Sequence, residues 1–117
     1  MGGGLSFLDQ CIRDGNVIYA VKLAREDICK FEALAKRLNV TLCEVLSKLL
    51  KQWLDSDRKI NLYESSKSAR VLFSFLVKKE LLEEYVKATE NTKYYEGVIV
   101  QSLLIDWFND QQNTARL

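Results

Sequence analysis

The chain contains no histidine and no proline, and it has only three cysteines and five glycines in 117 residues. Without histidine, it lacks the commonest general base and the usual catalytic triads. Three is an odd number of cysteines, and no two stand in a Cys-x-x-Cys spacing. This pattern argues against a zinc site and against a disulfide framework, and it is typical of a reducing compartment. The glycines form no phosphate-binding loop.

Long apolar runs are also missing. No segment approaches the roughly 20 apolar residues of a transmembrane helix, and we expect no signal peptide at the start. The hydrophobic share of 48%, the charged share of 28% and the net charge of +1 are those of an ordinary globular protein. Carboxylates are plentiful, but they stand beside lysines on helical faces, where a solvated surface explains them. We therefore expect one cytoplasmic, non-enzymatic domain with no cofactor and no metal.

An internal repeat becomes visible when the sequence is shifted by 54 residues. "YAVKLAREDICKF" (residues 19–31) then lies over "FSFLVKKELLEEY" (residues 73–85) without a gap. In the same register "VLSKLLKQWL" (residues 45–54) lies over "IVQSLLIDWF" (residues 99–108), and Trp53 matches Trp107. Few positions are identical, but the apolar pattern coincides throughout. The sequence therefore predicts a two-fold repeat.

Each copy reads as a strand, a helix, a turn and a second helix. The strands alternate with a period of two, and their bulkier set should face inward: Tyr19, Val21, Leu23, Phe73, Phe75 and Val77. In the first copy, Thr41 and Glu44 form a capping box for the second helix. In the second copy Tyr95 stands in place of Thr41, so we expect Asn91 or Thr92 to cap a helix that begins earlier. Gly97 inside that helix either allows a close backbone approach or is a tolerated weak position.

A lone strand cannot satisfy its backbone groups, so the two strands should pair as an antiparallel ribbon over four helices. We assign residues 1–15 to a flexible tail, 16–55 to copy 1, 56–68 to a linker, 69–110 to copy 2 and 111–117 to a C-terminal tail. Leu5, Leu8 and Ile12 in the first tail could alternatively form a weak helical stripe. Ile60, Leu62 and Tyr63 suggest that the polar linker is partly held on the surface.

The order of elements resembles the ribbon–helix–helix family of DNA-binding proteins. In that comparison "AVKLARED" is the strand entering the first helix and "VTLCEVL" begins the second. The family's usual proline after the strand is replaced by Ala24 and Lys78. Family members dimerise to make the ribbon, whereas this chain carries both copies, so it is similar to the single-chain tandem regulators of archaeal viruses. The resemblance implies a mainly α fold with one two-stranded ribbon, and a transcriptional regulator such as a repressor in the host cytoplasm.

By that resemblance, the partner is double-stranded DNA, the ribbon enters the major groove, and self-association along DNA is allowed. The outward side chains that would read bases are Ile18, Ala20, Lys22, Leu72, Ser74 and Leu76. The residues expected to contact phosphates are Asn16, Arg25, Thr41, Leu42, Arg70, Lys78, Lys79, Lys93 and Tyr94. A solvated surface is the alternative for the basic members of these sets.

The ribbon also departs from the family. Three of its six outward positions are large aliphatic residues, which can contact thymine methyl groups but cannot make bidentate hydrogen bonds to guanine or adenine. The rival hypothesis is therefore a protein-interaction module that uses Ile18, Leu72 and Leu76 as its contact patch. An unrelated helical bundle is disfavoured by the repeated strand pattern. Trp53 and Trp107 are expected to pack in the core between the halves. Tyr94 and Tyr95 fit either a turn beside a phosphate or a lid over the core.

Overall fold

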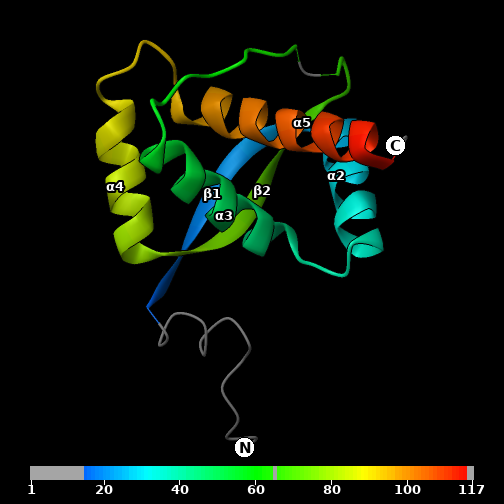
Figure 1. The fold of residues 1–117 in the computed structure, drawn as a ribbon, viewed down its shortest axis with the longest axis horizontal. Helices are drawn as coiled ribbons and strands as arrows, with labels where there is room; N and C mark the ends of the chain where they lie inside the picture. The colour runs from blue at the N-terminus through cyan, green and yellow to red at the C-terminus, as the bar shows by residue number, and fades with distance from the viewer. Residues whose placement is uncertain (1–14, 65, 116–117) are drawn as a thin grey trace, which may run out of the picture.

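The computed structural model describes residues 15–64 and 66–115. Their elements follow the order β1 (Asn16–Ala24), α2 (Arg25–Arg37), α3 (Leu42–Asp55), β2 (Arg70–Lys78), α4 (Lys79–Thr89) and α5 (Glu96–Ala115) (Figure 1). This part of the chain is mainly helical with one two-stranded antiparallel sheet, which confirms the coarser part of the predicted fold class. The tandem ribbon–helix–helix arrangement stays a prediction. The predicted N-terminal tail and its alternative helical stripe fall almost entirely on residues 1–14, outside the described residues.

The two strands pair along their whole length. Asn16 lies opposite Lys78, Ala20 opposite Ser74 and Ala24 opposite Arg70. The inward faces of both strands are the apolar ones that the alternation predicts, and their buried members are Val21, Leu23, Phe75 and Val77. β1 leads directly into α2 and β2 into α4, while α3 and α5 cross in front of the ribbon (Figure 1).

The core lies between the inner face of the ribbon and the four helices. Each helix contributes an apolar stripe at helical spacing, so burial of that stripe drives its docking. The most deeply buried side chains are Phe31 of α2, Leu46 and Leu50 of α3, Tyr85 of α4, and Ile99, Val100 and Leu104 of α5. The core therefore draws on both halves of the chain.

The two tryptophans differ in burial. Trp53 is only 3% exposed and packs edge-on against Tyr85, with ring centroids 5.7 Å apart. Trp107 is half-buried at the edge of the core. The Phe31 ring packs not on Trp107 but on the next residue, Phe108, with ring centroids 6.2 Å apart. The core position predicted for both indoles is confirmed for Trp53 and only partly met by Trp107.

The helix starts follow the repeat. The Thr41 hydroxyl accepts a 3.1 Å hydrogen bond from the Glu44 N–H, which confirms the predicted cap. α5 begins at Glu96, so the earlier start predicted from Asn91 or Thr92 is wrong. Thr92 is used within the preceding turn, where its hydroxyl bonds the Thr89 carbonyl oxygen at 2.9 Å. α5 continues to Ala115, beyond the predicted end of copy 2 at residue 110.

The linker between α3 and β2 runs over α5 (Figure 1) and is held by hydrogen bonds at several points. The Tyr63 hydroxyl donates a 2.7 Å hydrogen bond to Asp106, and the Gln101 amide donates to the Tyr63 carbonyl oxygen. Further along, the Ser68 hydroxyl accepts from the N–H of Glu26 at 3.0 Å. The linker thus caps α2, whose own N-cap residue, Ala24, has no side chain that could do so.

Candidate nucleic-acid interface

The outer face of the ribbon is open to solvent. Leu72 is 67% exposed and Ile18 48% exposed, although both are large aliphatic residues within the strand pair. The other outward side chains are Ala20, Lys22 and Ser74, which are exposed, and Leu76, which is half-buried. The structure thus brings all six residues predicted to read bases together on one face. That they contact DNA stays a prediction.

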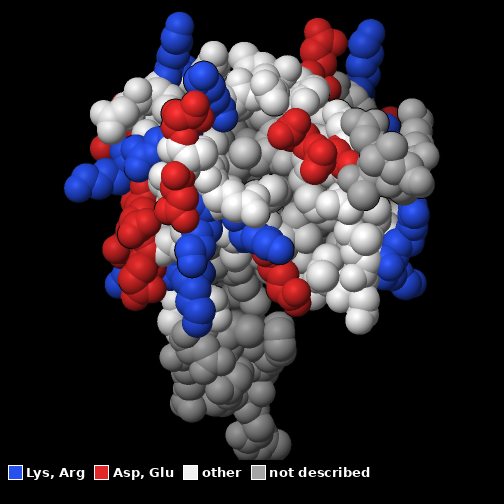
Figure 2. All heavy atoms as spheres, in the orientation of Figure 1, with Lys and Arg blue, Asp and Glu red and all other residues white. Residues whose placement is uncertain are grey.

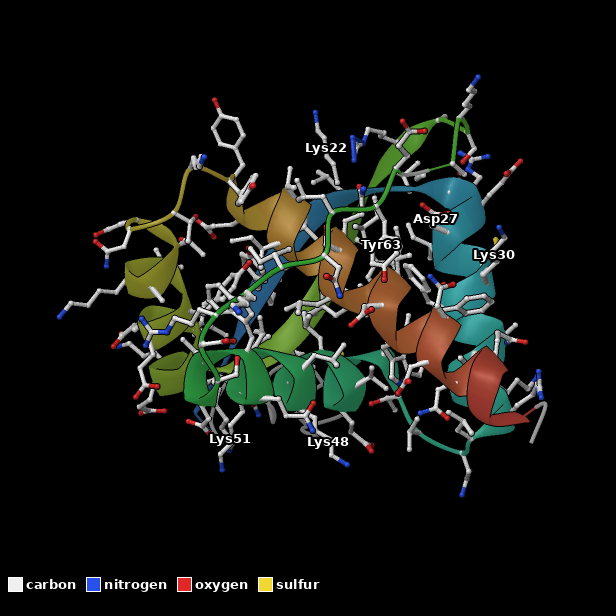
Figure 3. The ribbon with its side chains drawn as sticks, turned by 45° about the horizontal axis from the view of Figure 1, so that its top comes forward. Lys22, Asp27, Lys30, Lys48, Lys51 and Tyr63 are labelled. Atoms are coloured by element: carbon white, nitrogen blue, oxygen red, sulfur yellow. The ribbon has the colours of Figure 1, made fainter. Side chains whose placement is uncertain are left out.

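The charge of this face has one sign. The strands contain Lys22, Arg70 and Lys78 and no acidic residue. Lys22 projects from the ribbon in the direction opposite to Lys48 and Lys51 of α3 (Figure 3). The cationic side chains of such a surface attract phosphate groups of a partner, and its apolar side chains can contact the partner's apolar groups.

The two ends of the ribbon differ chemically. At one end Lys22 lies opposite Leu72, and at the other Ile18 lies opposite Leu76. Beside the aliphatic end, the backbone N–H of Leu76 donates to the Cys43 sulfur at 3.4 Å. The residue that matches Cys43 in the second copy is Gly97, whose missing Cβ would meet no atom within 4 Å. Of the two interpretations of Gly97, the structure therefore supports the tolerated weak position.

The first-copy residues predicted to bind phosphate lie at helix starts. Thr41 caps α3 and Leu42 is its first residue; the Leu42 side chain is buried, so only its backbone could meet a phosphate. Arg25 begins α2, and its N–H donates at 2.9 Å to the carbonyl oxygen of Ala69, the residue before β2. That amide is therefore engaged, and only the exposed side chain of Arg25 is offered to a partner.

In the second copy, the residues predicted to bind phosphate lie before the second helix and not at its start. Because α5 begins at Glu96, Lys93 and Tyr94 lie in the preceding turn and not at the helix start. The N–H of Tyr94 already donates to the Thr92 hydroxyl at 3.2 Å, and its half-buried ring packs on the core. Tyr94 is thus the lid, whereas Tyr95 is 86% exposed at the position that matches Thr41. The early helix start on which this prediction relied is wrong, whereas contact of Lys93 and Tyr94 with phosphate stays a prediction.

The remaining predicted contacts flank the ribbon. Asn16 and Lys78 form its last pair at one end. Lys79 begins α4, and its N–H donates to the carbonyl oxygen of Gly15 at 2.9 Å. Arg70, at the other end, donates a 2.6 Å hydrogen bond to Gln101 of α5, so it ties β2 to that helix.

One cluster that the sequence did not suggest fixes α5 beside the ribbon. The Tyr19 hydroxyl donates to the Glu96 carboxylate at 2.9 Å, and the Tyr85 hydroxyl donates to the Glu96 carbonyl oxygen at 2.8 Å. Burial, then the hydrogen bond to Glu96, raises the pKa of Tyr19. Burial likewise raises the pKa of Tyr85. Both phenols are therefore protonated donors at neutral pH; Tyr19 holds the start of α5 against β1, and Tyr85 holds it against α4.

A metal-binding cluster and a membrane span are both missing from the described residues. No three cysteine or carboxylate side chains there lie close enough to hold a metal ion. Within residues 15–64 and 66–115, no helix has both the length and the apolar character needed to cross a bilayer. Comparison of this chain with models of protein families, with curated proteins and with solved structures finds no match.

Proposed function

We propose that this chain is a single-chain, tandem ribbon–helix–helix protein that binds double-stranded DNA by placing its ribbon in the major groove. The observation that carries the proposal is the ribbon itself: one face packs on helices, and the other is exposed, partly cationic and free of acidic residues. A two-stranded ribbon fits the major groove, where base edges are distinguishable. Occupying that groove would regulate transcription without catalysis.

The pairing register supports the tandem interpretation. Ala20 lies opposite Ser74, the residue 54 positions further along, which is also the offset of the sequence repeat. A pair of matching residues in mutual register is what a two-fold axis through the ribbon requires. The order strand, helix, helix occurs twice around this pair.

The target should lack good two-fold symmetry. A homodimer presents identical side chains to both half-sites, but here one strand offers Ile18, Ala20 and Lys22 and the other offers Leu72, Ser74 and Leu76. Lys22 suits a guanine edge or a phosphate, and the leucines suit thymine methyl groups. The two half-sites therefore meet different chemistry.

A gel-shift assay tests the proposal, with genomic and random duplexes compared across a salt series. We expect saturable binding with a preferred sequence and an affinity that falls as salt rises. The absence of binding at low salt would reject it. The second candidate function, a protein-interaction module, is favoured by the exposure of Leu72 and Ile18. Capture of a protein partner would test it, with Leu72→Ser as the control.

A further inference from the structure

A groove lies on the helical side of the molecule, between α3 and the C-terminal half of α5. It has a volume of about 480 Å³, and its apolar lining includes Leu38, Leu49 and Trp107. Its charged lining residues are Glu44, Asp106 and Asp110 against a single base, Lys48. Figure 2 shows this side of the molecule, where uncharged surface lies between acidic side chains. The groove thus combines apolar with polar lining residues, and its charged residues are mainly acidic.

The position of Trp107 explains part of the apolar lining of this groove. In the first copy Trp53 is covered by Tyr85, and the residue that matches Tyr85 is Phe31. Phe31 packs on Phe108 instead. Successive residues on a helix are about 100° apart, so directing Phe108 inward turns Trp107 toward the side. Its half-buried indole then becomes part of the groove lining.

The chain itself carries a surface complementary to this groove. The outer ribbon face offers the exposed side chains of Ile18 and Leu72 beside Lys22, with no acidic residue on either strand. The apolar residues could meet Leu38, Leu49 and Trp107 of the groove, and the cation could meet its acidic residues. Lys22 on the ribbon and Lys48 on the groove project in opposite directions (Figure 3), so the ribbon cannot reach the groove of its own molecule.

We propose that the groove binds the ribbon face of a second copy of this chain, head to tail. Because a groove of this size accepts only a few side chains, the contact belongs to the small, weak class of interfaces. The chain is then monomeric at low micromolar concentration and associates at higher concentration. The contact is heterologous, so it leaves one ribbon and one groove open at the ends of each assembly. The inference does not rest on DNA binding; where the ribbon does bind DNA, the groove of another copy competes with it.

Sedimentation of the full chain from about 10 μM to about 1 mM tests the contact. Leu72→Ser removes the most exposed ribbon leucine, Leu38→Lys places a cation in the groove, and Leu62→Ser is the matched control on an exposed linker leucine. We expect the first two variants to weaken association about tenfold and the control to leave it unchanged. A wild-type chain that stays monomeric throughout the range would overturn the proposal.

Mixing the variants separates this contact from a symmetric one. Leu72→Ser keeps its groove and Leu38→Lys keeps its ribbon, so the mixture should give a heterodimer that grows no further. Failure to form it, or association lost in Leu72→Ser but kept in Leu38→Lys, indicates ribbon-to-ribbon pairing and overturns the proposal. Lys48→Glu is a gain-of-function check at an exposed site: a more acidic groove should strengthen association about threefold. Weaker association of that variant would contradict the charge argument.

Discussion

The Tyr19 hydroxyl lies 2.9 Å from the Glu96 carboxylate and joins β1 to the first turn of α5 across 77 residues of chain. Tyr85 donates to the main chain of the same glutamate. The ring centroids of Tyr19 and Tyr85 are 6.2 Å apart in an edge-on arrangement. The three residues therefore form one unit that holds the two halves together.

This unit should make the protein sensitive to alkali. The folded-state pKa values of Tyr19 and Tyr85 are raised, so their contribution to stability is complete below the unfolded pKa of about 10 and is lost as pH rises above it. Each raised tyrosine should steepen the fall of the unfolding free energy by up to about 1.4 kcal/mol per pH unit. Urea unfolding between about pH 8 and about pH 11, a range that brackets the ordinary tyrosine pKa, measures the slope. Tyr19→Phe should reduce it, and an unchanged slope would count against the cluster.

Lys22 and Leu76 should affect DNA binding in different ways. Lys22→Ala should weaken specific binding by about 1–3 kcal/mol if the side chain reads a base. If it touches only phosphate, binding should weaken evenly across sequences and the salt slope should fall by about one unit. Leu76→Ala should relax the preference for A·T pairs and hardly alter the salt dependence, with Leu62→Ala as the control. If neither variant changes DNA binding while Leu76→Ala abolishes capture of a protein partner, the interaction module replaces the groove-reading hypothesis.

Two glycines should respond oppositely to alanine. A Cβ on Gly97 meets open space within α5, so Gly97→Ala should stabilise the fold by up to about 1 kcal/mol through helix propensity. Gly15 has a φ of +88°, so Gly15→Ala should destabilise by about 1 kcal/mol. Thermal and chemical unfolding of the two variants measures both changes. A destabilised Gly97→Ala variant would mean that the backbone at this position has a role that the structure does not show.

Separating the two halves should unfold them. In a fragment of residues 1–58, Val21 and Leu23 lose their facing strand and Trp53 loses Tyr85. We expect this fragment to be unfolded as a monomer, and co-expression with residues 59–117 to restore the fold, as followed by circular dichroism and sedimentation. A homodimer of the fragment would agree with the repeat. A cooperatively folded monomer would contradict the shared core.

The sequence predicted most of the fold because its signals are local. Alternation in both strands, the apolar stripes and the Thr41 cap all depend on neighbours within a few residues, and the structure has each of them. The start of α5 was mispredicted because Tyr95 is a poor capping residue by sequence, and long-range bonds from Tyr19 and Tyr85 fix that helix instead. Such bonds leave no local pattern to find.

The difference in burial between Trp53 and Trp107 could not be predicted from the sequence either. The repeat aligns Trp53 with Trp107, and a repeat alone gives both the same environment. Whether Phe31 packs on Trp107 or on Phe108 depends on the rotation of α5, which comes from packing of the whole core. For the same reason, the groove beside Trp107 could not be inferred from the sequence. The outward ribbon residues could be, because a strand has only two faces.

The pairing of Ala20 with Ser74 also has a consequence for synthesis. After Ala20, the ribosome must add 54 further residues before Ser74, the partner of Ala20 in β2, is made. At about 5–20 residues per second, that delay is about 3–11 s. During this delay the largely apolar strand β1 has no partner strand, at the stage when nascent chains are most prone to aggregate. Translation speed across the linker codons should therefore influence how much of the newly made protein reaches the native state.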